Sequence, residues 1–316
     1  MANYMAHADA CKVAISNDIL GIINTSAGGY EIKMKFTKMH GSGNDYIYVN
    51  CFEEDLTGRN LPELAVCMSR CHYGVCSDGL ILIMPSDVAD LRMCMYNSDG
   101  SEGRMCGNGA RCIGRYAWER GLVKKKKMTL ETLSGIRTLE IIEEDGKIKA
   151  VTVDMGVPEL HPDRIPVALG GERVVERATQ IVGRTFPMTC VSMGNPHAVL
   201  FVDEDPFTMK AFDTYGARLE SDPIFPDKVN VEFVQRLSDS RLRMRVWERG
   251  SGETLACGTG TCASVVAAKL TGRVMGSDIR VTTRGGDLDV SWEGNGKPVM
   301  LTGPAAFVFD GVWLDD

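Results

Sequence analysis

The chain contains an internal repeat, and this repeat constrains the fold more than any other feature. The tetrapeptide Cys-Gly-x-Gly occurs at Cys106–Gly109 and again, 151 residues later, at Cys257–Gly260. A glycine-containing loop precedes each copy at the same spacing, because Gly43 and Gly194 each lie 63 residues before the cysteine. This period is far longer than the roughly 20–50 residues of solenoid repeats. The sequence therefore predicts two copies of one domain.

Helices and strands can be placed around the two motifs. Apolar residues recur at helical spacing after each Cys-Gly-x-Gly, and the runs end at Gly121 and Gly272, as is typical of helix C-termini. Short runs rich in branched residues, separated by Gly, Asp and Pro, predict strands elsewhere. These runs are Ile81–Met84, Met128–Thr132, Arg137–Ile142, Lys149–Asp154, Met188–Ser192, Val199–Val202, Val229–Val234, Leu242–Trp247 and Ile279–Thr283.

The expected fold class is α+β, with two pseudo-symmetric halves that face each other. The first half is expected to span residues 34–157 and the second half residues 158–303, with a boundary near Pro158 to Pro166. A last strand around Ala306–Phe309 is expected to return to the first half, so that residues 304–316 complete it. Residues 1–33 form an N-terminal extension of unknown role, and Met34 offers an alternative start.

Composition excludes several classes of protein. Hydrophobic residues make up 44% of the 316 residues and charged residues 24%, which is typical of a soluble globular protein. Apolar runs such as Leu80–Met84 are too short for a membrane helix. The net charge of −7 argues against nucleic-acid binding, which normally needs a basic surface. Residues 1–33 contain acidic residues and no arginine, unlike a transit peptide. Eleven cysteines without a secretory signal predict unpaired thiols in a reducing cytosol.

The repeated motif suits acid–base chemistry. A cysteine at the start of a helix lies at the positive end of the helix dipole, which lowers the pKa of the thiol. The glycines let a substrate approach the backbone, whose free N–H groups can hold a carboxylate. Cys106 and Cys257 could then face opposite sides of one carbon. One thiolate would remove a proton while the other thiol delivers one, and this inversion would need no cofactor.

Most of the other cysteines are expected to be packing residues. Cys112 and Cys262 fall inside the predicted helices. The cluster of Cys67, Cys71, His72 and Cys76 lacks the paired Cys-x-x-Cys spacing of zinc sites, so no metal site is predicted. Gly41-Ser42-Gly43 lacks the third glycine of a dinucleotide fingerprint, and the chain has no Walker motif.

Polar residues in turns predict a site for a small zwitterion. Arg249 is suited to clamp a second carboxylate. His197 and Glu248 are titratable and lie near the two cysteines in the repeat, so either could set the protonation of the thiols. Five asparagines lie beside glycine, proline or other turn residues: Asn44, Asn97, Asn108, Asn195 and Asn230. Asparagine is also a common turn former, and that interpretation stays open for each of them.

At these residues the chain resembles the diaminopimelate epimerase family. The resemblance runs from about Met34 to the C-terminus and is carried by Lys38–Tyr46, Asn97–Glu102, Met105–Cys112, Gly194–His197, Trp247–Thr254 and Ala256–Gly260. It implies two domains, each with a barrel-like sheet around a central helix, and an active site in the cleft between them. It also implies interconversion of LL- and meso-diaminopimelate, without pyridoxal phosphate or another cofactor, in lysine biosynthesis.

The resemblance implies roles for individual residues. Cys106 and Cys257 correspond to the catalytic acid/base pair, and His197 and Glu248 to positions that tune the thiols. The positions that hold the reacting carboxylate correspond to Gly107, Asn108, Gly258 and Thr259. The other substrate-contacting positions correspond to Asn44, Asn97, Asn195, Asn230, Glu248 and Arg249. The chain departs from the family pattern at Gly79, where some members have glutamine, and at Tyr46, where phenylalanine is commoner.

Other functions remain open at this point. A related cofactor-independent racemase acting on another amino acid would keep both cysteines, although proline racemases carry histidine at the position of Asn108. A non-catalytic amino-acid-binding protein would use the same cleft without needing both thiols. A thiol–disulfide oxidoreductase normally carries Cys-x-x-Cys, which this chain lacks. The expected partners are a small-molecule substrate and a second copy in a homodimer, with no nucleic acid and no membrane.

Overall fold

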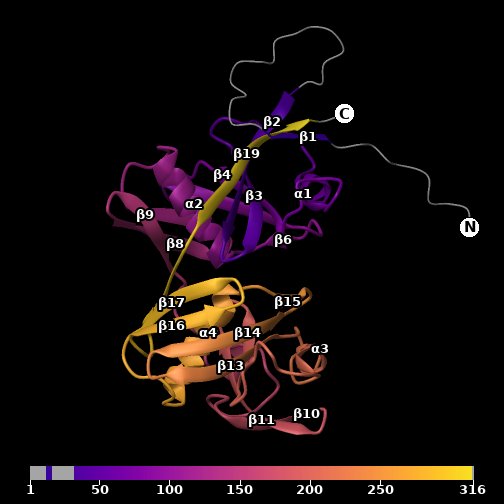
Figure 1. Ribbon diagram of the computed structural model, residues 1–316, viewed down its shortest axis with the longest axis vertical. Coiled ribbons are helices and arrows are strands. Elements are labelled where there is room, and N and C mark those ends of the chain that lie inside the picture. Colours follow the sequence, from indigo (N-terminus) through magenta and orange to yellow (C-terminus); the bar gives the residue numbers. More distant parts are fainter. Residues whose placement is uncertain (1–11, 16–31, 315–316) are drawn as a thin grey trace, which may run out of the picture.

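The computed structural model describes residues 12–15 and 32–314, which form two lobes stacked along the long axis (Figure 1). Most of the N-terminal extension expected for residues 1–33, and the last two residues of the chain, lie outside this part. Strand β1 (Lys12–Ile15) belongs to the extension and pairs antiparallel with β19 (Ala306–Leu314). Within the described residues, no helix is long and apolar enough to cross a membrane.

The first lobe is a curved sheet around one helix. Helix α2 (Gly107–Glu119) packs inside the sheet, and α1 (Leu61–Ser69) packs on β4 and β5. The strands pair in the order β19-β2-β3-β4-β5-β7-β8-β9, and the short β6 (Glu102–Gly103) adds to β5. Their bounds are β2 (Ile32–Gly41), β3 (Asn44–Asn50), β4 (Gly79–Met84), β5 (Leu91–Asn97), β7 (Lys127–Thr132), β8 (Gly135–Glu144) and β9 (Lys147–Asp154).

The second lobe repeats this arrangement after a short 3-10 helix (Pro162–Arg164). Helix α4 (Gly258–Leu270) packs inside its sheet, and α3 (Phe212–Glu220) packs on β13 and β14. The strand order is β10-β11-β12-β13-β14-β16-β17-β18, and β15 (Gly252–Thr254) adds to β14. The bounds are β10 (Arg177–Ile181), β11 (Arg184–Ser192), β12 (Pro196–Phe201), β13 (Asn230–Ser238), β14 (Arg241–Glu248), β16 (Asp278–Thr283), β17 (Gly286–Trp292) and β18 (Val299–Gly303).

The two lobes correspond residue by residue at one offset. Helices α2 and α4 begin at Gly107 and Gly258, and helices α1 and α3 begin at Leu61 and Phe212, 151 residues apart in both cases. The offset is the one found between the two Cys-Gly-x-Gly motifs. The predicted fold class, α+β with two pseudo-symmetric halves built around central helices, is therefore confirmed.

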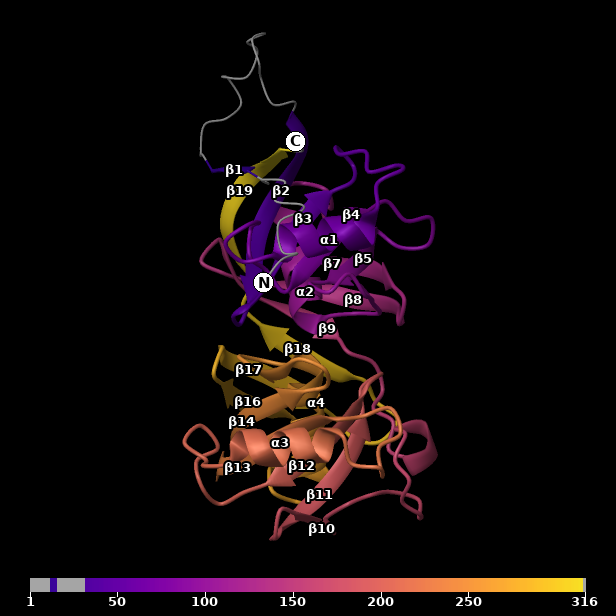
Figure 2. The same cartoon turned by 90° about the vertical axis from the view of Figure 1, so that its right-hand side faces the viewer.

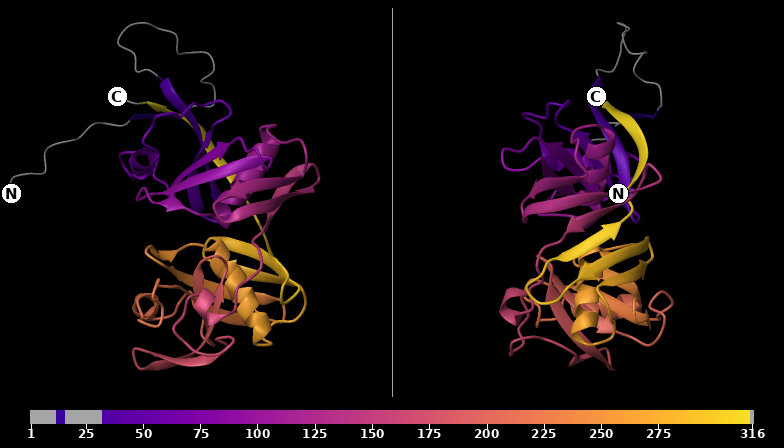
Figure 3. Two further views of the ribbon diagram at one scale, coloured as in Figure 1. Left: turned by 180° about the vertical axis from the view of Figure 1, so that it is seen from behind. Right: turned by 90° about the vertical axis from the view of Figure 1, so that its left-hand side faces the viewer.

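One sheet contact and one crossing of the chain join the lobes. β9 of the first lobe pairs antiparallel with β18 of the second at the junction (Figure 2), where the hydroxyls of Thr152 and Thr302 lie 2.8 Å apart. After β18 the chain returns to the first lobe, where β19 lies antiparallel to β2 (yellow beside indigo in Figure 3). The main hydrophobic core includes buried residues of both α2 and α4, such as Ile113 and Val266. The starts of the two central helices are thereby fixed relative to each other.

The cysteines differ from expectation at one place. Cys71 and Cys76 were expected to be free thiols, but they form a disulfide. The chain turns back on itself between them, with positive φ at His72 and Cys76, and their Cα atoms come within 4.1 Å. The other eight described cysteines are free.

Candidate active site

Each repeated cysteine begins a central helix, as the sequence predicts. Cys106 is the N-cap of α2, and its Sγ accepts the N–H of Gly109 at 3.4 Å. Cys257 is the N-cap of α4, and its Sγ accepts the N–H of Gly260 at 3.4 Å. The remaining N–H groups of these first turns are available to an anion, since a helix start has no preceding turn to accept them.

The last glycine of each motif is required by close packing. A Cβ atom on Gly109 would lie 2.6 Å from Cδ1 of Ile81, and one on Gly260 would lie 2.5 Å from Oε1 of Glu232. Ile81 and Glu232 are themselves 151 residues apart. The residue that contacts the glycine therefore occupies the corresponding position in each half. The glycines let each helix start lie directly on the strand beneath it.

A cavity of about 960 Å³ lies between the two lobes, lined by residues of both. Six of the predicted binding residues line this cavity: Asn44, Asn97, Asn195, Asn230, Glu248 and Arg249. Tyr46, Asp78 and Arg284 also line it, and the sequence analysis had not predicted a binding role for these three. The polar residues that the sequence predicted come from separate turns, and the structure brings them together around this one cavity.

No residue of the two motifs lines this cavity, but the motifs contact residues that do, and they contact each other. Cys257 and Asn108 are buried, and Cys106 is half-buried. The side-chain amide of Asn108 donates to Oδ1 of Asn44 at 3.2 Å and to the carbonyl of Ala256 at 3.4 Å. Because Asn44 lines the cavity and Ala256 directly precedes Cys257, these contacts join the cavity to both motifs.

Burial dominates the electrostatics of both thiols. Burial raises the pKa of Cys106, and the N–H of Gly109 and the hydroxyl of Tyr46 oppose this rise. Burial raises the pKa of Cys257 well above its ordinary value, and the carboxylates of Glu248 and Glu232 raise it further. The helix N–H groups lower the thiol pKa as expected, but desolvation of the thiolate outweighs them, so the net shift of both pKa values is upward.

The predicted residues at the far end of the cavity keep free hydrogen-bonding groups. Arg249 is exposed, its backbone N–H donates to Oδ1 of Asn230, and its Nη1 donates to the carbonyl of Asp227. No carboxylate pairs with Arg249 among the described residues. Burial raises the pKa of Glu248, which accepts a hydrogen bond from Thr254. Arg249 can thus offer its guanidinium to a ligand at this end, whereas Glu248 also hydrogen-bonds Cys257.

Comparison with known proteins places the chain in a family. The sequence model described as "Diaminopimelate epimerase" matches residues 36–161 and 189–308. The chain belongs to the diaminopimelate epimerase family. The protein named diaminopimelate epimerase from Acetivibrio thermocellus is 52% identical over 279 residues, which are 88% of this chain and 98% of the relative. The protein of the same name from Bacillus subtilis is 48% identical over 285 residues, with 89% and 98% covered.

Solved structures of more distant proteins share the fold of this family member. A hydroxyproline epimerase from Agrobacterium vitis superposes with a TM-score of 0.67 at 17% identity, covering 91% of this chain and 95% of that one. A PhzF-family phenazine biosynthesis protein from Bacillus anthracis gives a TM-score of 0.64 at 17% identity, with 89% and 99% covered. At this identity the likeness concerns the two-lobed fold.

One residue of this family member that the sequence analysis missed is Glu232. Its side chain has no exposed surface, and its Oε1 lies 2.7 Å from Nδ1 of the equally buried His197. The internal repeat held a signal for it, because the corresponding residue of the first half is the apolar Ile81. A carboxylate at a position that is apolar in the other copy indicates a local role beyond packing.

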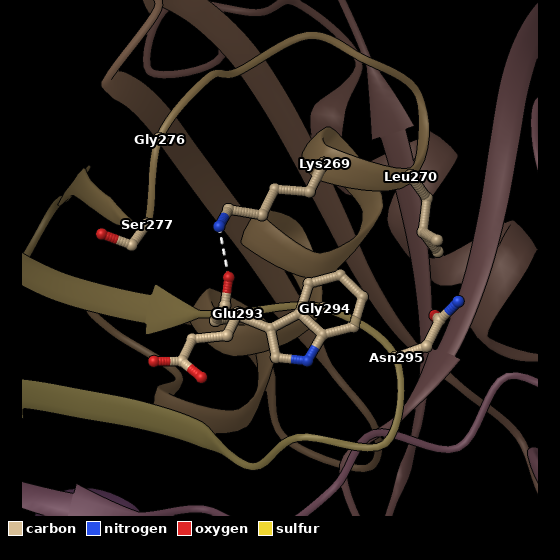
Figure 4. Close-up of a pocket in the computed structure, with 8 residues that line it drawn as sticks. Lys269, Leu270, Gly276, Ser277, Glu293, Gly294 and Asn295 are labelled. Carbon is tan, nitrogen blue, oxygen red and sulfur yellow. Dashed lines mark hydrogen bonds between the residues drawn. The ribbon is translucent and has the colours of Figure 1, made fainter.

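A second pocket lies away from the cysteines. A pocket of about 530 Å³ lies beside the end of α4, where Lys269 donates to the backbone carbonyl of Trp292 (Figure 4). None of the predicted site residues lines this pocket. In the part of the chain that the structure describes, no three His, Cys, Asp or Glu side chains are grouped to hold a metal ion.

Proposed function

We propose that this protein epimerises 2,6-diaminopimelate at one α-carbon, interconverting the LL and meso forms, by a two-base mechanism that uses Cys106 and Cys257. The observation that carries the proposal is the pair of cysteine-capped helix starts, one from each half, held together by Asn108 next to a single polar cavity. The named activity of relatives about half identical to this chain supports the choice of substrate.

The geometry suits removal and return of one proton. The reacting carboxylate is held by backbone N–H groups of Gly107-Asn108 and Gly258-Thr259, at the positive ends of α2 and α4. One thiolate takes the α-proton, and the negative charge spreads into the carboxylate that these groups stabilise. The thiol on the opposite face then delivers its proton and inverts the centre. The reverse reaction exchanges the two roles, so no other proton carrier is needed.

The far end of the substrate carries a second ammonium and a second carboxylate. Arg249 binds this carboxylate, with the amides of Asn97, Asn195 and Asn230 around it. A cavity with several polar groups disfavours substrates that leave those groups unpaired. Asn44 lies at the reacting end, where its Oδ1 is 3.4 Å from Sγ of Cys106. His197 and Glu248 tune the thiols.

The test is epimerisation in deuterated water. LL-diaminopimelate should give meso-diaminopimelate with one deuterium on the inverted carbon, as read by chiral chromatography and mass spectrometry. The kcat/KM for diaminopimelate should exceed those for lysine, proline and histidine by about 10⁴-fold or more on the same preparation, because these lack the distal amino-carboxylate. Comparable values for any monocarboxylate would instead indicate a racemase of another amino acid.

The remaining expectations belong to the same proposal. Residues 34–157 with 304–316, and residues 158–303, are proposed as the two domains, which is supported by the pairing of β19 with β2. The enzyme is proposed to act in the cytosol, as a homodimer, and to supply lysine biosynthesis. Light scattering of the purified protein tests the dimer, and rescue of a strain that cannot make meso-diaminopimelate tests the pathway.

A further inference from the structure

The two halves orient corresponding asparagines in opposite ways, and the first half presents an acceptor to its cysteine. Asn44 lies at the start of β3, and its Nδ2 donates to Oδ2 of Asp78 at 2.6 Å. The oxygen of the same amide therefore faces Cys106, whose Sγ lies 3.4 Å from Oδ1. An amide oxygen only accepts hydrogen bonds, so this contact favours the protonated thiol of Cys106.

The second half presents a donor to its cysteine. Asn195, which corresponds to Asn44, places its Oδ1 3.0 Å from Nε2 of His197 and donates its N–H to Oγ1 of Thr259 at 3.3 Å. Oγ1 of Thr259 lies 3.4 Å from Sγ of Cys257. Because the hydroxyl oxygen already accepts from Asn195, its hydrogen is free to point at the sulfur. This contact favours the thiolate of Cys257.

The direction of this chain of hydrogen bonds starts at Glu232. The Oδ1 atom of Asn195 can only accept, so Nε2 of His197 must carry a hydrogen. The other ring nitrogen, Nδ1, faces Oε1 of Glu232 at 2.7 Å, and both side chains have no exposed surface. Oε2 of Glu232 has no hydrogen-bond partner among residues 12–15 and 32–314, so His197 is the residue that pairs this buried carboxylate there. The contact between Glu232 and Nδ1 therefore holds the ring with Nε2 facing Asn195.

The first half has no counterpart of this pair. The residues that correspond to Glu232 and His197 are Ile81 and Tyr46, at the shared offset of 151. The hydroxyl of Tyr46 contacts Cys106 itself and lowers its pKa, whereas burial raises that pKa. Different side chains therefore lower the pKa of the two thiols, although the backbone around them is repeated.

Cys257 needs such a donor more than Cys106 does. The groups that act on it are Glu248 on β14, Glu232 on β13, and the Thr259 hydroxyl and Gly260 N–H on α4. Burial raises the pKa of Cys257, both carboxylates raise it further, and the Thr259 hydroxyl and the Gly260 N–H lower it. Without the hydroxyl, the Gly260 N–H would oppose the effect of two nearby carboxylates with one hydrogen-bond donor fewer.

We propose that Glu232 is a positioning residue that, through His197 and Asn195, aims the hydroxyl of Thr259 at Cys257 and so stabilises its thiolate. The inference rests on the proposed function, in which Cys257 acts as one of the two bases. When the thiolate takes the α-proton of the substrate, the bond from Thr259 weakens, and it reforms when the proton returns to carbon. The proton moves only between carbon and sulfur, and the chain supplies orientation.

The experiment measures the thiols without substrate. The wild type, Glu232→Gln and Thr259→Val are alkylated with iodoacetamide across a range of pH, and the rate at each cysteine is followed by peptide mass spectrometry. Thr259→Val removes the donor, and Glu232→Gln replaces the carboxylate that holds the ring of His197 through Nδ1. Each should slow alkylation of Cys257 near neutral pH by about tenfold and shift its profile to higher pH, since one charge-assisted hydrogen bond is lost.

Three comparisons make the result decisive. The alkylation profile of Cys106 in the same samples should not move. Thr261→Val, which removes a hydroxyl bonded to the backbone carbonyl of Cys257, should leave both profiles unchanged. The Glu232→Gln, Thr259→Val double variant should be no slower than Thr259→Val alone, because both act through one donor.

Unchanged or faster alkylation of Cys257, equal shifts at both cysteines, or additive effects would each overturn the proposal. Failure to epimerise diaminopimelate would overturn only the proposed function, because alkylation needs no substrate.

Discussion

The side-chain amide of Asn108 donates a 3.4 Å hydrogen bond to the carbonyl of Ala256, and this bond joins the cysteine motif of the first half to that of the second. The same amide donates to Asn44 at 3.2 Å. In the corresponding position of the second half, Thr259 contacts Cys257 and Asn195 instead. One position of the repeat therefore links the lobes in one copy and contacts the thiol in the other.

Asn108→Ala should weaken both the fold and the reaction. Two hydrogen bonds are lost, at about 1 kcal/mol each, so the free energy of unfolding in urea should fall by about 2 kcal/mol. The kcat should fall more than KM rises, because the bond fixes the two motifs relative to each other. Asn295→Ala, at an exposed loop residue, is the control and should change neither quantity. Equal behaviour of the two variants would argue against this link.

The pH dependence of kcat/KM follows from the two thiols. The reactive free enzyme needs one thiolate opposite one thiol, and burial raises the pKa of both above the ordinary cysteine value. The thiolate is therefore scarce at neutral pH and increases as pH rises. We expect kcat/KM to rise about tenfold per pH unit through neutrality, up to the lower thiol pKa. A flat profile across this range would show that another group controls the ionisation.

Tyr46→Phe should move this rise to higher pH. Burial raises the pKa of Cys106, and the Tyr46 hydroxyl is one of the groups that lower it again. Removing the hydroxyl leaves the thiolate of Cys106 less stable, so more alkaline conditions are needed to form it. Tyr48→Phe is the matched control, since Tyr48 lies two residues along the same strand and its hydroxyl faces Cys112. The pH–kcat/KM profile of that control should match the wild type, and a shift shared by both variants would count against the specific role of Tyr46.

The two motif glycines should respond differently to alanine. In Gly109→Ala the new methyl group meets Cδ1 of Ile81, the end of an apolar side chain that can turn away. In Gly260→Ala it meets Oε1 of Glu232, which is held by His197. We expect Gly260→Ala to lose at least tenfold more kcat than Gly109→Ala, with the folded state of each checked by circular dichroism. The reverse order would mean that the Glu232–His197 pair does not support the reaction.

Arg249→Lys tests the far end of the cavity. A lysine point charge cannot reproduce the two parallel hydrogen bonds of a guanidinium, so kcat/KM for diaminopimelate should fall by about tenfold or more. Arg284→Lys is the comparison, because Arg284 lines the same cavity but pairs with Glu253. Equal losses in the two variants would remove the assigned role of Arg249.

The repeat made much of the fold predictable. The positions of α2 and α4, the nine strands around them and the returning last strand all follow from periodicity and the shared spacing. Helices α1 and α3 were missed, because Leu61–Ser69 and Phe212–Glu220 have only nine residues each and give too short a window for a periodic pattern. Strands β3, β5 and β17 were also missed, since β17 alternates polar with apolar residues and β3 and β5 hold few branched residues.

The sequence predicted which residues gather, but not how they bond. Asn44 and Asn195 were predicted as equivalent polar residues, yet Asp78 and His197 turn their amides in opposite directions. Glu232 escaped notice because it lies inside an otherwise apolar strand with no turn residue beside it. The thiol pKa values were predicted from the helix dipole alone, and burial, which depends on the packing of both lobes, reversed the direction.

The two-base mechanism is tested most directly by removing one thiol at a time in deuterated water. Cys106→Ala and Cys257→Ala should both fail to interconvert LL- and meso-diaminopimelate, since each thiol serves one face of the α-carbon. Each variant should still exchange the α-proton of one stereoisomer for deuterium without inverting it, and the two variants should act on opposite stereoisomers. Substantial epimerisation by Cys257→Ala would contradict the account.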